Sequence, residues 1–259
     1  MHPFFISTYP GVAVTQNTEY VIHTSQFPTP WDEKSADTEN AYESKFKSGI
    51  TMWRFEDTED AAGTGHHIGR MLKEESFTID LPPLTLDNFD AGRKSSHGLV
   101  VGLASYKNTH YIYVYDYLKA SQLKSNKFND MALVATNDLI AAGAFALIPL
   151  QAQARSIKTD PTGAYFITAS ENAQVFNSEK IHKAMDMKDF AGETVLGLPT
   201  INPEGVLHGS VQLGNKVIDI AFDYRKNVAY ASAFNDKKLI RWNYESLAIE
   251  DELILSFRP

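Results

Sequence analysis

The sequence predicts an all-β chain that folds as a β-propeller of four to five blades, with few short surface helices. An aromatic–polar–aromatic–acid pattern returns along the chain at intervals of about 63 residues, and such a period indicates repeated modules. The leading aromatic residues of the four copies are Trp53, Tyr115, Phe176 and Trp242. The 15 Phe and 12 Tyr of the chain also favour β-structure, because flat side chains pack well on a pleated surface.

Composition indicates a globular chain of acidic net charge, in which a local basic patch remains possible. The 259 residues are 43% hydrophobic, which is enough for a sizeable core, and the net charge is −8. Binding of nucleic acid needs a basic face, so this charge argues against it. There is no cysteine, no leader that begins basic and continues apolar, and no apolar run near the roughly 20 residues that cross a bilayer. We expect a cytoplasmic protein that binds neither membranes nor nucleic acids.

A second alignment supports the repeat. Residues 154–170 lie without gaps over residues 217–233, which places Asp160 on Asp223. Each copy is expected to form a strand, a tight turn and a second strand. The Asp-Pro-Thr-Gly turn that begins at Asp160 has the right chemistry, since Asp caps its own backbone, Pro sets φ and Gly accepts a positive φ.

The second strand of the last copy indicates how the modules pack. In residues 228–234, Val-Ala-Tyr-Ala-Ser-Ala-Phe, alanines fill one face of the strand and neither face is charged. A sheet with one face in water should alternate apolar and charged or polar side chains, whereas a sheet packed on both faces need not. Propeller blades are packed on both faces by their neighbours, so the pattern favours a propeller over a sandwich.

Two segments resemble the blades of lactonase-like and gluconolactonase-like β-propellers. They are Thr-Asp-Pro-Thr-Gly-Ala-Tyr-Phe-Ile-Thr-Ala-Ser (159–170) and the stretch 222–247, which ends in Arg-Trp-Asn-Tyr-Glu-Ser-Leu. The resemblance implies a propeller and, for its enzymes, a metal held near the axis by a Glu, Asn side chains and an Asp. Here no Glu stands at the head of an expected inner strand, which departs from that pattern.

We predict one domain over residues 1–259. Its repeat units lie at roughly 1–60, 90–120, 150–180 and 213–250. The polar segment 27–48 is interpreted as an insertion between the second and third strands of the first unit. Loops at this position emerge at one rim of a propeller, so this rim is the predicted binding surface. Degenerate further blades, or an incomplete ring that associates with a second copy, remain alternatives.

The predicted binding residues come from these equivalent loops. Trp31 lies in the polar insertion, where folding does not require a tryptophan, and exposed tryptophans are enriched at binding hot spots. The full set is Trp31, Tyr106, His110, Asn172, Asn235 and Asp236.

Metal-binding candidates are few. Asp160 and Asp223 repeat, so we interpret them as turn caps rather than catalytic groups. Asp219 has no acidic counterpart in the aligned copy, and with His97 or His23 it is the candidate ligand for a divalent metal such as calcium. We otherwise expect no cofactor.

Three functions follow in order of preference. The first is a non-enzymatic scaffold or assembly subunit that binds a protein partner through the rim. The second is a metal-dependent, lactonase-like hydrolase with its site at the axis, and the third is a carbohydrate-binding propeller.

Overall fold

The computed structural model describes residues 6–10, 18–28, 46–59, 67–71, 76–82, 84–91, 99–123, 126–128, 131–223 and 226–259. These residues form one seven-stranded sheet, three four-stranded sheets and a two-stranded ribbon. The first sheet contains β1 (Ile6–Pro10), β2 (Thr18–Pro28), β3 (Phe46–Glu59), β4 (His67–Met71), β5 (Phe77–Leu81), β9 (Asn126–Phe128) and β10 (Met131–Ala135).

The other three large sheets follow one another along the chain. The second sheet has the order β11-β8-β7-β6, from β6 (Thr85–Ala91), β7 (Leu99–Tyr106), β8 (Thr109–Asp116) and β11 (Phe145–Leu150). The third sheet is β12 (Ser156–Thr159), β13 (Tyr165–Ala169), β14 (Asn172–Asn177) and β17 (Leu207–Gln212). The fourth sheet is β18 (Val217–Asp223), β19 (Val228–Ala233), β20 (Lys238–Asn243) and β21 (Ala248–Ile254).

Short elements fill the connections between third and fourth strands. Helices α1 (Tyr117–Gln122) and α2 (Thr136–Ala141) lie between β8 and β11. Helix α3 (Ser178–Met187), the ribbon β15 (Thr194–Val195) and β16 (Leu198–Pro199), and helix α4 (Pro203–Val206) lie between β14 and β17. No helix among the described residues is long and apolar enough to cross a membrane.

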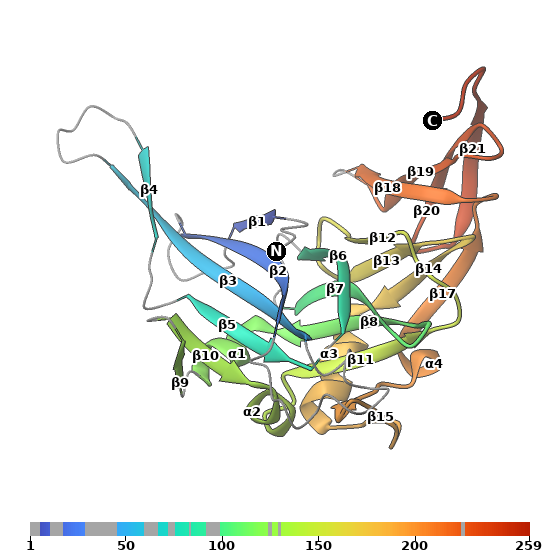
Figure 1. Cartoon of the computed structure of the whole chain (residues 1–259). Helices are drawn as coiled ribbons and strands as arrows, with labels where there is room; N and C mark the ends of the chain where they lie inside the picture. Colours follow the sequence, from blue (N-terminus) through green and yellow to red (C-terminus); the bar gives the residue numbers. More distant parts are fainter. Residues whose placement is uncertain are drawn as a thin grey trace.

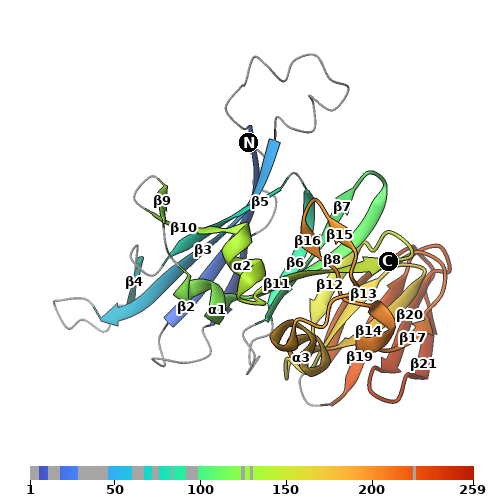
Figure 2. The ribbon, with the colours of Figure 1, turned by 90° about the horizontal axis from the view of Figure 1, so that it is seen from below.

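The sheets stand side by side around their first strands, as blades do in a propeller. β12 contacts β6 on one side and β18 on the other, while β6 contacts β1 and β2. One hydrogen bond joins two of these strands directly, because the Thr159 amide donates to the Asp90 side-chain carboxylate at 2.8 Å. The predicted all-β propeller class is confirmed, with four large sheets in an open arc whose first and last members lie far apart (Figures 1 and 2).

Three apolar cores lie between successive sheets. Tyr115 belongs to the core between the first and second sheets, Phe176 to the next, and Trp242 to the core between the third and fourth sheets. All three side chains are at most 1% exposed. The repeated aromatic residue therefore marks the third strand of the second, third and fourth sheets and packs against the preceding sheet. The side chain of Trp53 lies outside the described residues.

The Asp-Pro-Thr-Gly turn has the predicted capping geometry. Asp160 accepts hydrogen bonds from the amides of Thr162, at 3.0 Å, and Tyr165, at 2.7 Å. Gly163 has a φ of 76°, a conformation that side chains with a Cβ disfavour. The interpretation of Asp160 as a turn cap is confirmed.

The first sheet departs from the simple repeat. After β8, the chain returns to the first sheet, where β10 pairs parallel to β5 before β11 completes the second sheet. The predicted insertion is also shorter than 27–48, because β2 extends to Pro28 and β3 begins at Phe46. Parallel pairing needs a long crossover, and no signal in the repeat pattern predicts one.

Candidate interaction surfaces

The structure places the predicted rim residues at equivalent positions. Each described one lies in or beside the turn between the second and third strands of its sheet: Tyr106 and His110 flank the β7–β8 turn, Asn172 begins β14, and Asn235 and Asp236 lie between β19 and β20. Since the turn positions match, these residues share one rim. Trp31 lies outside the described residues.

Two of the rim residues form hydrogen bonds to a neighbouring loop. The Asp236 carboxylate accepts a hydrogen bond from the Asn215 amide at 2.6 Å, and the Asn235 side chain donates to the Asn215 side chain at 3.2 Å. These bonds fasten the loop between β17 and β18 to the β19–β20 turn. The rim residues thus have local structural contacts, and binding by them remains a prediction.

The described metal candidates do not gather. Asp219 is exposed on β18, 4.0 Å from the Lys158 ammonium group of the neighbouring first strand. His23 is paired through its backbone to Ile6, and His97 lies outside the described residues. No group of three or more His, Cys, Asp or Glu side chains that could hold a metal occurs in the described part of the chain.

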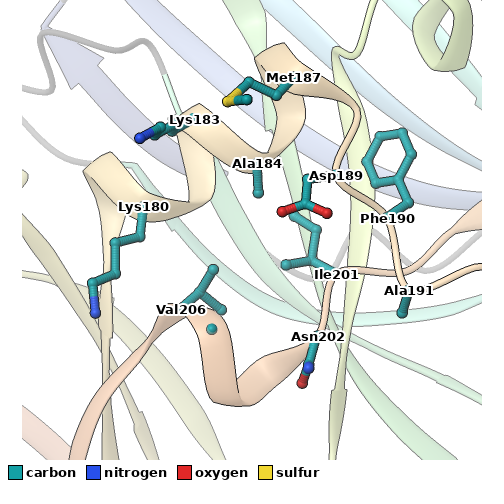
Figure 3. A pocket seen from close by; sticks show the side chains of 11 residues that line it. Lys180, Lys183, Ala184, Met187, Asp189, Phe190, Ala191, Ile201, Asn202 and Val206 are labelled. Atoms are coloured by element: carbon teal, nitrogen blue, oxygen red, sulfur yellow. The ribbon is translucent and has the colours of Figure 1, made fainter.

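A groove that the sequence did not predict lies between helices α3 and α4. Its volume is about 580 Å³, and its lining comes from α3, the segment that follows it, and α4. Figure 3 shows Asp189, Ile201 and Val206 between the two helical segments, with Met187 and Phe190 along the upper and right-hand sides. We call it the α3–α4 groove.

The lining of the α3–α4 groove combines apolar and cationic side chains. Met187 is 69% exposed, and Phe190 is half-buried beside it. Lys180 and Lys183 line the α3 side, and Asp189 is the one acid of the lining. The balance of charge in the groove is therefore positive, on a molecule whose net charge is −8.

Helix α3 is positioned by its caps and its apolar side. The Asn177 side chain accepts a hydrogen bond from the Lys180 amide, which caps the N-terminus, and Lys188 ends the helix in the left-handed conformation. Ile181 and Met185 lie four residues apart and are fully buried against the second and third sheets. The opposite side, with Lys180, remains at the surface.

A charged network ties α3 to α1. His182 lies 3.5 Å from the buried Asp116 carboxylate through Nε2 and 3.3 Å from the Asp186 carboxylate through Nδ1. The Lys119 ammonium group also contacts Asp186. Burial raises the pKa of Asp116, although the Lys119 amide and the nearby cations oppose this shift. The network fixes the helix that forms one wall of the α3–α4 groove.

A close backbone approach completes this support. Gly143, in the turn between α2 and β11, has a φ of 61°, and a Cβ there would lie 2.3 Å from the Met185 carbonyl oxygen. Only glycine fits at this contact. The sequence did contain a signal for the helix, namely the Asn177 cap followed by Ile181 and Met185 at helical spacing, but no signal for the groove beside it.

Comparisons with known proteins identify no family. No model of a protein family matches the chain, and no curated protein matches it. Similar solved structures include a functionally unknown protein from Desulfotomaculum acetoxidans, with 13% identity and a TM-score of 0.48, covering 98% of this chain and 57% of that one. Apo AztD from Citrobacter koseri has 13% identity and a TM-score of 0.44, with 95% and 59% coverage.

A third similar structure is a WD40 domain, from the coronin of Toxoplasma gondii. It has 11% identity and a TM-score of 0.41, and the match covers 65% of this chain and 34% of that one. The chain thus spans between about a third and three-fifths of the length of these solved chains. The comparisons do not identify the lactonase-like family.

Proposed function

We propose that this chain is a non-enzymatic β-propeller scaffold that binds a protein partner, and that the α3–α4 groove holds a segment of that partner. The observation that supports the proposal is the groove lining. Met187 is exposed beside Phe190 in a concave site of about 580 Å³, and flexible methionines suit surfaces that receive a partner's apolar side chain.

The charge of the groove lining indicates which kind of partner segment would bind there. Lys180 and Lys183 outnumber the acid Asp189 in the lining, so an apolar anchor flanked by acidic residues complements the groove. The groove also has a firm base, because α3 is fixed by buried Ile181 and Met185. A rigid wall lowers the entropy lost on binding. The partner is proposed to be cytoplasmic.

The predicted rim is a second surface for the same function. It carries the loops with Tyr106, His110, Asn172, Asn235 and Asp236, and the sequence predicts that the insertion with Trp31 lies there too. Helix α3 follows the far end of β14 from this rim, so the two surfaces lie at opposite ends of the third sheet. Variants can therefore separate them.

Site-specific cross-linking tests the groove. A photoreactive amino acid replaces Met187 in the full chain, and the same replacement at Leu118, which is 38% exposed on α1, is the control. A third variant carries it at Trp31, in the insertion that the sequence predicts at the rim. We expect a cross-linked product of defined mass from position 187 and none from position 118.

Binding of the purified cross-linked partner then decides the proposal. Met187→Asp should weaken its affinity by about tenfold, since it introduces an acid and removes an apolar contact, whereas Leu118→Asp should leave it unchanged. Both sites are exposed, so neither change should unfold the chain. Equal effects of the two changes would contradict the groove. Products from position 31 alone would transfer the function to the rim.

A further inference from the structure

The outer strand of the fourth sheet is unusually exposed. All seven residues of β21 are exposed, whereas β11, the outer strand of the second sheet, is almost entirely buried. Four large apolar side chains of β21 and the residues that follow it are exposed. They are Ile249, at 43%, Leu253, at 58%, Ile254, at 75%, and Phe257, at 63%.

The backbone of β21 presents hydrogen-bonding groups to this edge. The Leu255 amide donates to the Lys237 carbonyl at 2.7 Å, and in an antiparallel pair every second residue bonds to the neighbouring strand. Glu252 and Ile254 therefore direct their amides away from β20. The Glu252 amide instead donates to the side chain of Asp251 at 2.9 Å, which agrees with this alternation.

The sequence of β21 decides which strand can pair with this edge. Residues 248–254 read Ala-Ile-Glu-Asp-Glu-Leu-Ile, with three acids at the centre and two apolar residues at each end. A second copy pairing antiparallel about the centre would place Asp251 against itself and Glu250 against Glu252. Like charges opposite one another destabilise a strand pair, so the edge disfavours self-association.

We propose that β21 is a docking edge for an extended segment of another protein, with lysine or arginine at its centre and apolar residues on both sides. Glu250 and Glu252 already pair with Arg241, at 2.9 Å, and Lys238, at 2.6 Å. A basic side chain of the incoming strand forms an ion pair with the Asp251 carboxylate. A backbone carbonyl of that strand then accepts the hydrogen bond from the Glu252 amide in place of Asp251. The exposed apolar side chains are covered at the two ends.

This edge is separate from the α3–α4 groove, which is lined by α3, α4 and the segments beside them, so the two proposals stand or fail independently. β-strand addition draws its affinity from main-chain hydrogen bonds and its specificity from alternate side chains. Both ingredients are present in β21. The edge recognises a basic extended peptide rather than a helix or a nucleic acid.

Three labelled peptides test the edge with the full chain. One has Lys-Arg-Lys between valine and threonine residues, the second has Glu-Asp-Glu in place of the basic centre, and the third is a scrambled form of the first. Fluorescence anisotropy measures their binding. We expect the first peptide to bind at least about tenfold tighter than the other two.

Matched variants separate charge from backbone pairing. Asp251→Lys should weaken binding of the basic peptide by about tenfold and strengthen binding of the acidic one. Glu171→Lys, the same reversal of charge at the exposed β13–β14 turn, should change the affinity for neither peptide. Ile254→Pro removes an outward amide and leaves the β20 pairing in place, so it should also abolish binding, while Ile254→Thr retains most of it. Circular dichroism verifies the fold of each variant.

Two outcomes overturn the proposal. One is equal binding of the basic peptide and its scrambled form, and the other is an equal loss of binding in Asp251→Lys and Glu171→Lys. Sedimentation adds a third test. A dimer of the unmodified chain that Ile254→Pro dissociates would assign the edge to a second copy instead.

Discussion

The third and fourth sheets contain the same four-strand meander, but they differ in how their faces are covered. The third sheet packs against the second sheet on one face and the fourth on the other. The fourth sheet packs its alanine-rich face, with Ala229, Ala231 and Trp242, against the third. Among the described residues, no further sheet covers its other face, which we call the open face (Figure 1).

Equivalent positions show how the sequence adapts to this difference. Ile167 and Val175 pair across β13 and β14 and are fully buried against the fourth sheet. Their counterparts on the open face are Tyr230 and Arg241, which pair across β19 and β20 and are half-buried. Buried apolar pairs are thus replaced by residue types that tolerate water and favour interfaces. The same four-stranded module therefore carries different side chains where its face is covered and where it is open.

A sequence repeat predicts the backbone of each sheet better than it predicts which faces are buried. Strand pairing and turns repeat because the backbone requires them in each sheet, whereas the faces follow the neighbours that each sheet has. A core residue in one blade therefore does not predict a core residue at the same place in the next. The predictions below test this contrast.

Exchanging side chains between the two faces should have the largest effect. Val175→Arg puts an unpaired charge into the core between the sheets and should reduce the free energy of unfolding by about 3 to 5 kcal/mol. Arg241→Val, the reverse change on the open face, removes a half-exposed ion pair with Glu250 and should change it by less than about 1 kcal/mol. Urea unfolding followed by circular dichroism measures both. Similar costs would show that the open face is covered in solution.

The turn after the first strand should give an intermediate effect. Asp160 is 1% exposed, and Asp160→Ala leaves the amides of Thr162 and Tyr165 without their acceptor, so we expect a loss of about 2 kcal/mol. Asp223→Ala, at the aligned position of the fourth sheet, should cost less, because Asp223 is half-exposed and water can replace it. Thermal unfolding of the two variants provides the comparison, and a larger loss for Asp223→Ala would contradict it.

The smallest expected effect appears at alkaline pH, at the contact between the two sheets. Burial, with the nearby carboxylates of Asp160 and Glu245, raises the pKa of Tyr244 well above its ordinary value of 10.0. The folded state thus favours the neutral phenol. Its contribution to stability is complete below about pH 10 and falls as the pH rises further, because the unfolded chain ionises there first.

Tyr244→Phe lacks this titration. Its free energy of unfolding should therefore fall less steeply than that of the unmodified chain as the pH rises from about 9 to 11. Urea titrations across this range measure the difference, which cancels the contributions of the other tyrosines. Parallel curves for the two proteins would show that Tyr244 ionises equally in both states.

The sequence predicted those features of the fold that repeat. The spacing of Tyr115, Phe176 and Trp242 gave the sheets and their packing, because the same interface requires a large flat side chain each time. The Asp160 turn was predicted for the same reason. For β19, the expectation of packing on both faces is correct for the alanine face and wrong for the Tyr230 face.

The candidate surfaces were less accessible from sequence. The α3–α4 groove joins segments on either side of the ribbon β15–β16, and one of its walls, α3, rests on the close contact of Gly143 with Met185. Such a contact leaves no periodic pattern. β21 is exposed because no element among the described residues covers it. The sequence of the strand itself does not predict whether a covering element is present.

The return of the chain to the first sheet has a consequence for how the protein is made. β5 gains its neighbour β10 only after β7 and β8 have been synthesised, and β11 then completes the second sheet. The first two sheets are therefore interlaced and must mature together during translation, whereas the third and fourth can be added one after the other. A synthesis pause before Met131 would leave β5 paired only with β3, with its other edge free, and such edges recruit foreign chains.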